Sequence, residues 1–256
     1  MQEGDSRLTC LFVHGWAMNS TVWKPLLDKL PDWVDAEVMD LPGHGGRVGE
    51  SFTNLQNITD DLLKKCKDIK RQHGIGQPLY LVGWSLGGLP CIQLATDHAE
   101  EISGLTLVSS NPCFVSKENW GYGIDAEVFE QFSQSLKKDF SGTIRRFLSL
   151  QVKGSESGRL VLRDLREKIL QQPRPDETNL DAGLEILKQV DLRGQIKKIK
   201  LPIDWVLGAQ DGLVKKQLAN ELDNTTVFNN AGHAAFLSHT EEFAQHLIKI
   251  LSRVHR

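Results

Sequence analysis

A serine in a glycine-flanked turn is the first feature of this chain that could carry chemistry. The motif Gly-Trp-Ser-Leu-Gly occupies residues 83–87, with Ser85 at its centre. The apolar, strand-like run 79–82 leads into the motif, and a helix-like run over 86–98 leaves it. Small residues on both sides let the backbone turn sharply, so that a serine hydroxyl stands exposed beside the positive end of a helix. This context favours Ser85 as a nucleophile over the alternative, an ordinary glycine-rich turn.

A serine nucleophile needs a base to take its proton and an acid to orient that base. His233 lies just after the apolar run 225–228, and Asp211 lies just after the run 202–207. Because the carboxyl ends of parallel strands meet at one edge of a sheet, we expect Ser85, Asp211 and His233 to lie close together. Taken alone, Asp211 also fits a turn or a helix N-cap, and His233 fits a surface loop.

The negative charge that develops on an attacked carbonyl must meet preset donors. The main-chain N–H of Leu86, directly after the serine, is one candidate for this oxyanion hole. The N–H of Trp16 is the second, because Gly15 before it allows close approach of the backbone.

Three other polar positions are assigned different roles. We expect His14 to brace its loop by hydrogen bonds and the turn over residues 40–45 to be structural. His239 is a second candidate base, but its position at the start of the last helix-like segment favours capping.

Composition limits the classes of function. The chain has 256 residues, a net charge of -3 and 40% hydrophobic residues, which is typical of a soluble globular protein with no global bias toward nucleic acid or membrane. Its four cysteines are scattered, which favours a reducing compartment, and we expect a cytoplasmic monomer with no signal peptide or spanning helix. The histidines lack metal-binding spacing, and the assigned chemistry requires no metal or cofactor.

Short apolar runs alternate with longer amphipathic ones, which predicts an α/β fold with parallel strands and crossover helices. Strands are predicted at 8–13, 35–39, 79–83, 104–109, 202–207 and 225–228. Helices between them are predicted at about 21–29, 55–72, 86–98 and 240–253.

Residues 114–190 break the alternation, because they contain helix-like segments and no convincing strand. We predict a helical cap there, inserted into a core made of 1–113 and 191–256. Its predicted pieces are Asp125–Lys138, Thr143–Leu150, Ser157–Gln171 and Thr178–Val190. An insertion after a strand at the carboxyl edge of an open sheet covers the usual ligand site, where it would exclude water.

With these residues in view, the chain resembles the pimeloyl-[acyl-carrier protein] methyl ester esterases (the BioH family) of the α/β-hydrolase superfamily, over nearly its whole length. The likeness is carried by His14-Gly15-Trp16 followed by Trp23, by the serine motif extended to Gly88, and by two strings in the cap, Arg146 to Gln151 and Gly183 to Leu187.

The resemblance implies a parallel sheet flanked by helices with a helical cap, and a triad of Ser85, Asp211 and His233. It implies a substrate pocket lined by Trp23, Trp84, Phe147, Leu148, Ser149, Leu150 and Gln151, with Leu86 beside them. From spacing alone, the aromatic and leucine members of this set fit an ordinary core equally well.

The activity that the resemblance implies is hydrolysis of the methyl ester at the far end of a pimeloyl chain on acyl carrier protein, in biotin synthesis. The thioester that tethers the chain must survive, so selectivity would come from threading only the far end to Ser85.

Recognition of an acidic carrier protein can be argued from charge. Arg159, Arg163 and Arg166 recur at i, i+4 and i+7, which places them on one face of a predicted cap helix. A solvated face paired with acidic neighbours is the alternative. By resemblance, Arg146, Arg159 and Arg163 match carrier-contact positions of the family, whereas Gly142 stands where the family has another arginine.

Other functions share these features. A broad-specificity short-chain carboxylesterase or an acyl thioesterase would use the same triad without needing the basic cap. A carbon–carbon hydrolase of the same fold also stays open. A binding module that has kept the scaffold is disfavoured, because such a protein has no chemical reason to retain all three polar residues.

Overall fold

The structure is a computed structural model that describes residues 7–74, 76–151, 160, 163 and 175–255. Its centre is a sheet in the order β2-β1-β3-β4-β5-β6, in which each neighbouring pair is parallel. The strands are β1 (Leu8–Val13), β2 (Val34–Met39), β3 (Leu79–Trp84), β4 (Gly104–Val108), β5 (Ile203–Gly208) and β6 (Thr225–Phe228). The predicted α/β fold with a parallel sheet is confirmed.

The strand sequences reflect their place in this sheet. Every residue of β1, β3 and β4 is buried, so these strands are continuous apolar runs rather than alternating ones. β2 lies at an edge of the sheet and keeps several half-exposed positions.

The helices follow the predicted positions, with differences at their ends. They are α1 (Lys24–Leu27), α2 (Leu55–His73), α3 (Gly88–Asp97), α4 (Ala126–Lys138), α5 (Phe140–Gln151), α7 (Glu177–Gln189), α8 (Arg193–Ile196), α9 (Ala235–Ser238) and α10 (Thr240–Val254). α2 packs with α3, and α1 packs with α9 and α10. No helix in the described part of the chain combines the length and apolar character needed to span a bilayer.

Two predicted helices are broken into shorter turns. The helix predicted over 21–29 is a 3-10 turn, Ser20–Trp23, followed by α1, in which Pro25 occupies the first turn, where a missing N–H costs nothing. The helix predicted from residue 86 starts as a 3-10 turn, Ser85–Gly87, before α3 begins.

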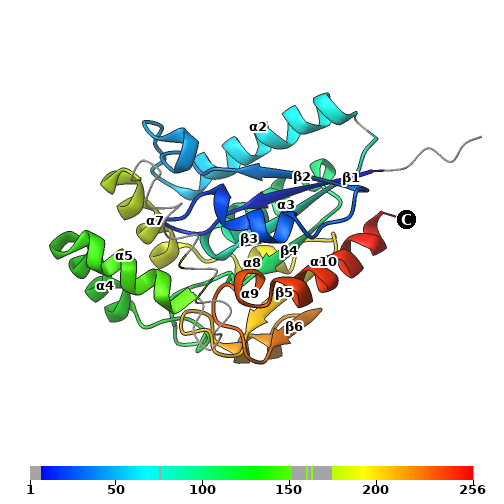
Figure 1. Ribbon diagram of the computed structural model, residues 1–256. Coiled ribbons are helices and arrows are strands. Elements are labelled where there is room, and N and C mark those ends of the chain that lie inside the picture. Colours follow the sequence, from blue (N-terminus) through cyan, green and yellow to red (C-terminus); the bar gives the residue numbers. More distant parts are fainter. Residues whose placement is uncertain (1–6, 75, 152–159, 161–162, 164–174, 256) are drawn as a thin grey trace, which may run out of the picture.

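The helices α4, α5 and α7 lie between β4 and β5 in the chain, and we call them the cap helices. They gather beside the edge of the sheet at which β1 ends (Figure 1). The segment that joins β4 to α4 holds only isolated bridges, Val115 with Ile124 and Lys117 with Trp120. The predicted piece Ser157–Gln171 falls largely on residues outside those described, and the boundaries of the cap at 114 and 190 stay a prediction.

The strand order places a ligand site at one point of this edge. The chain runs from β1 to β2 on one side and then returns to β3 on the other side of β1. Loops that leave the carboxyl ends of β1 and β3 therefore diverge, which opens a crevice between them. Trp16 and Ser85 follow these two strands.

Candidate active site

Ser85 occupies a strained turn at the end of β3. Its φ is +54°, a left-handed conformation that costs a non-glycine residue energy and persists where surrounding structure enforces it. A Cβ on Gly87 would overlap the main chain of Val13 and His14, and a Cβ on Gly83 would lie 2.7 Å from the Cα of Gly88. Glycine is therefore required on both sides of the serine for the turn to pack against β1 and α3.

Asp211 and His233 form a buried pair at the ends of β5 and β6. His233 Nδ1 donates to Asp211 Oδ2 over 2.8 Å. The other carboxylate oxygen, Oδ1, accepts the N–H groups of Leu213 at 2.7 Å and Val214 at 3.1 Å. With Nδ1 used as a donor, Nε2 of His233 carries the lone pair that a general base needs.

His233 also packs against the serine turn. The indole Nε1 of Trp84 donates to the carbonyl of His233 at 2.9 Å, and the two rings lie 5.8 Å apart. His233 Nε2 is buried without a hydrogen-bond partner among the described residues, and Ser85 Oγ makes no direct bond to it. Such contacts often tighten only when substrate binds, and the role of His233 as the base for Ser85 stays a prediction.

His14 braces the loop after β1. Its Nδ1 donates to the carbonyl of Gly15 at 2.8 Å, and its Nε2 accepts the N–H of Leu41 at 3.0 Å. The bond from Leu41 requires a neutral imidazole, and burial, followed by the neighbouring His44, lowers the pKa of His14 to about 3. The predicted structural role of His14 is confirmed.

The turn over residues 40–45 is also structural. Asp40 accepts the N–H of Ser20 at 2.6 Å and the N–H of Gly46 at 2.9 Å. Its carboxylate thus holds together the loops that follow β1 and β2.

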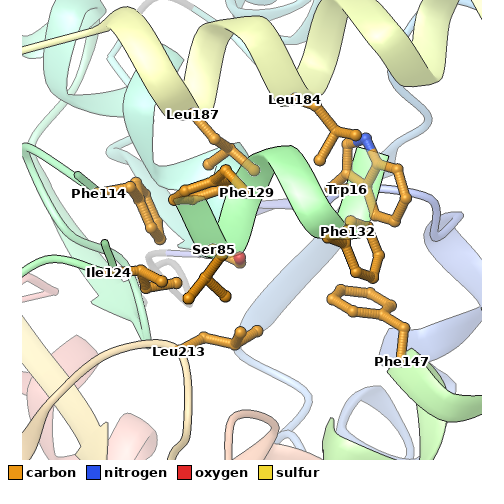
Figure 2. Close-up of a pocket in the computed structure, with 11 residues that line it drawn as sticks. Trp16, Ser85, Phe114, Ile124, Phe129, Phe132, Phe147, Leu184, Leu187 and Leu213 are labelled. Carbon is orange, nitrogen blue, oxygen red and sulfur yellow. The ribbon is translucent and has the colours of Figure 1, made fainter. Parts of the chain in front are cut away.

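A cavity of about 160 Å³ opens at Ser85, between the sheet and the cap helices (Figure 2). Around Ser85, apolar and aromatic side chains form its wall: Trp16, Phe114, Ile124, Val128, Phe129, Phe132, Phe147, Leu184, Leu187 and Leu213. A mostly apolar molecule bound in this cavity would therefore place its polar group at Ser85.

Two residues of the implied pocket are not on this wall. Trp23 lies in the core, with its ring 4.3 Å from Phe236 and 5.2 Å from Phe12, and Trp84 packs beside it. The indole that does line the cavity is that of Trp16, for which we predicted only a main-chain role. The assignment of Trp23 and Trp84 to the wall is corrected here: both rings face inward from the loop and strand that support the site.

The segment 147–151 is divided in its contacts. Phe147 lines the cavity, Leu148 is buried outside its wall, and Ser149 donates to the carbonyl of Arg145 on the exposed side of α5. The side chain of Leu150 is outside the described part of the structure. Gln151 contacts the base loop instead, because its carbonyl accepts the N–H of Ala234 at 2.8 Å. Only Phe147 of this segment is therefore seen on the wall.

Most of the wall was not singled out from the sequence. Val128, Phe129 and Phe132 share one face of α4, and Leu184 and Leu187 share one face of α7. This periodicity is visible in the sequence, but it is the same pattern that an ordinary core helix shows.

The implied carrier contacts are only partly described. Arg146 is exposed on α5, where it donates to Thr143 Oγ1 at 3.0 Å and lies 3.9 Å from Asp139. Arg163 is exposed, and Arg159 lies outside the described residues. At Gly142, the N–H donates to Asp139 Oδ1 at 2.9 Å, and a Cβ would collide with that carboxylate.

His239 is not positioned as a base for Ser85. Its Nδ1 bonds to Ser238 Oγ at 2.8 Å. It is the N-cap residue of α10, as predicted, and its carbonyl accepts the N–H of Phe243 at 2.8 Å, but its side chain makes no capping bond. Among the described residues, no group of three potential ligands is arranged to hold a metal ion.

Comparison with known proteins identifies the family of this chain. The sequence profile of the alpha/beta hydrolase fold matches residues 10–240. A pimeloyl-[acyl-carrier protein] methyl ester esterase of Salmonella newport is 38% identical over 98% of this chain and 95% of its own length. The chain belongs to this esterase family of α/β-hydrolases.

Solved structures share the fold at lower identity. An esterase from Exiguobacterium antarcticum superposes with a TM-score of 0.84 at 18% identity, over 96% of this chain and 92% of that one. A bromoperoxidase from Bacillus anthracis superposes with a TM-score of 0.82, also at 18% identity and over the same shares. Their different activities show that the fold alone does not decide the reaction of a family member.

Proposed function

We propose that this protein is a serine carboxylesterase that hydrolyses the methyl ester of pimeloyl-acyl carrier protein, a step of biotin synthesis. The observation that carries the proposal is the apolar cavity that ends at Ser85, in a chain 38% identical to esterases named for this reaction. The buried Asp211–His233 pair supports the hydrolytic chemistry.

In the proposed reaction, Ser85 Oγ attacks the ester carbonyl while His233 Nε2 takes its proton. The main-chain N–H groups of Trp16 and Leu86 donate hydrogen bonds to the carbonyl oxygen as it becomes negatively charged. His233 then protonates the departing methanol, which leaves an acyl-enzyme on Ser85. A water molecule deprotonated by the same imidazole releases the carboxylate product and restores the serine.

The wall of the cavity suits the ester better than the product. An ester is neutral and can leave water for an apolar wall, whereas a carboxylate without a partner loses its hydration there at high cost. The residues seen on the wall include no cation that could compensate. Hydrolysis would therefore convert a ligand that the cavity accepts into one that it rejects, which favours release of the product.

The same cavity limits which end of the substrate reacts. An apolar cavity of about 150 Å³ holds a ring of about six carbons in a well-studied protein, which is close to the size found here. A short spacer ending in a methyl ester fits this space, whereas a thioester joined to a bulky carrier protein stays outside. This arrangement supports selective cleavage of the distal ester.

The direct test is mass spectrometry of methyl-pimeloyl carrier protein after incubation with the enzyme. We expect a loss of mass equal to conversion of the methyl ester to the acid, with the thioester intact. Ser85→Ala should abolish this change and labelling by a fluorophosphonate probe. A folded wild type that neither labels at Ser85 nor alters the ester would refute the proposal.

A comparison of substrates separates this function from that of a general esterase. Arg146→Glu places an acidic group on the exposed side of α5, so it should raise KM for the carrier-linked ester and leave a small soluble ester unchanged. Ser149→Ala, on the same side of the helix, is the matched control for damage to α5. Equal rates on carrier-bound and free methyl pimelate would instead favour a broad-specificity carboxylesterase, and cleavage of the thioester would favour an acyl thioesterase.

A further inference from the structure

Trp16 belongs to both parts of the proposed site. Its main-chain N–H is the predicted second oxyanion donor, and its indole is part of the cavity wall. Trp16 is only 2% exposed, and its indole also contacts all the cap helices defined above. This second set of contacts has no role in the reaction as proposed so far.

The polar contact is made with α7. Trp16 Nε1 donates to the carbonyl of Leu180 at 2.9 Å. One turn further along α7, Gly183 packs directly on the indole, and a Cβ there would lie 2.7 Å from Cδ1 of the ring. A glycine at position 183 therefore lets the helix backbone approach the indole closely.

The aromatic contacts are made with α4 and α5. Phe132 of α4 meets the Trp16 ring edge to face, with centroids 5.4 Å apart, and Phe147 of α5 does so at 5.2 Å (Figure 2). Edge-to-face pairs of this kind fix orientation as well as bury area. The indole is thus held by one hydrogen bond and two oriented rings, all from the cap helices.

The loop that these contacts hold is strained. Ala17, the next residue, has a φ of +58°, a left-handed conformation that is unfavourable for alanine. A hydrogen bond from the N–H of Met18 to the carbonyl of Gly15 closes the turn at 3.3 Å. Such strain persists only where neighbouring contacts enforce it, and the Trp16 indole supplies contacts of this kind.

We propose that the indole of Trp16 is a positioning group, which ties the loop after β1 to the cap helices and so holds the Trp16 main-chain N–H toward the developing oxyanion. This inference rests on the proposed function and adds a means by which docking of the cap completes the oxyanion hole. The indole acts through the backbone of its own residue, so its effect does not depend on the length of the acyl chain.

The test is Trp16→Phe, which keeps an aromatic ring but removes the Nε1–H. We expect kcat to fall about tenfold, because the loss of the stabilisation that one hydrogen bond provides corresponds to about this factor. KM should change less than about twofold. The fall should be equal for p-nitrophenyl acetate, whose acyl group is too short to fill the cavity, and for methyl-pimeloyl carrier protein. The inhibition constant of a methyl trifluoromethyl ketone, whose adduct carries an oxyanion, should rise by the same factor.

Trp120→Phe is the matched control. The indole of Trp120 also donates to a main-chain carbonyl, that of Cys113 at 2.8 Å, but its ring is not on the cavity wall. We expect this variant to keep the wild-type kcat and ketone affinity. A loss in Trp16→Phe confined to the long-chain ester, or an equal loss in both tryptophan variants, would overturn the inference.

A second variant keeps the test decisive if Trp16→Phe does not fold. Gly183→Ala leaves the indole in place but presses a methyl group against it, and it should lower kcat on both esters in the same way. An unchanged kcat on both would count against the positioning role. A wild type without esterase activity would refute the proposed function itself, whereas an active wild type with fully active variants would overturn only this inference.

Discussion

His14 should make the stability of this protein depend on pH by an amount that can be calculated. The imidazole is fully buried, and its Nε2 accepts the N–H of Leu41, a bond that only the neutral form can make. Burial is the main reason that its pKa falls from 6.5 to about 3, and His44 lowers it further. The folded protein therefore keeps His14 neutral in mild acid.

The direction of the effect follows from comparing the two states. Above pH 6.5, His14 is neutral in the folded and the unfolded chain, and its full contribution to stability is present. As the pH falls below 6.5, only the unfolded chain takes up this proton, so the free energy of unfolding falls until the pH reaches about 3. Between pH 7 and pH 5, the uptake of one proton by the unfolded chain alone lowers the free energy of unfolding by about 2 kcal/mol.

Urea denaturation at pH 7 and pH 5 measures this difference. Glutamine in His14→Gln can still accept the Leu41 N–H but does not titrate, so the wild type should lose about 2 kcal/mol more than the variant between the two pH values. His98→Gln removes a surface histidine and should keep the acid sensitivity of the wild type. Equal losses in the wild type and His14→Gln would show that the folded protein accommodates the proton, and the reasoning would be refuted.

Three further outcomes are expected. Asp211→Asn should lower kcat about 10⁴-fold on p-nitrophenyl acetate without altering circular dichroism, because an amide favours the wrong tautomer of His233; a loss below tenfold would contradict the assignment of the acid. Gly87→Ala should lower the free energy of unfolding by more than about 2 kcal/mol, because its methyl group would overlap carbonyls at the end of β1, whereas Gly121→Ala, which meets open space, should not. The carboxylate product should inhibit weakly, with an inhibition constant at least about tenfold above KM for the ester, and inhibition as strong as ester binding would show that the cavity tolerates charge.

Much of the site could be predicted from local sequence because its positions have local causes. Ser85 requires small neighbours, and Asp211 and His233 each follow a run that forms a strand: β5, which is mostly buried, and β6, which lies at the edge of the sheet. Parallel strands place their carboxyl ends at one edge whatever the loops between them contain. The nearness of Asp211 and His233, and the neutral brace at His14, therefore followed from the order of elements along the chain.

The assignment of tryptophans shows what the sequence left undecided. Trp16 and Trp23 are both aromatic and both follow β1, yet the first lines the cavity and the second lies in the core against Phe236. The difference arises because α4, α5 and α7 converge on Trp16, and these helices come from a part of the chain more than a hundred residues away.

The sequence by itself determined where the strands lie along the chain, the sharp turn at Ser85 and the edge at which polar side chains gather, since each depends on short-range patterns of apolar and small residues. The order of the strands in the sheet came from the tertiary structure. Only the tertiary structure decided which apolar faces of the cap helices close around Ser85 and which indole they hold. Hydrophobic periodicity predicts that one face of a helix is buried, but it does not identify the residues against which that face packs. Those packing partners decide whether the face belongs to an ordinary core or lines a site.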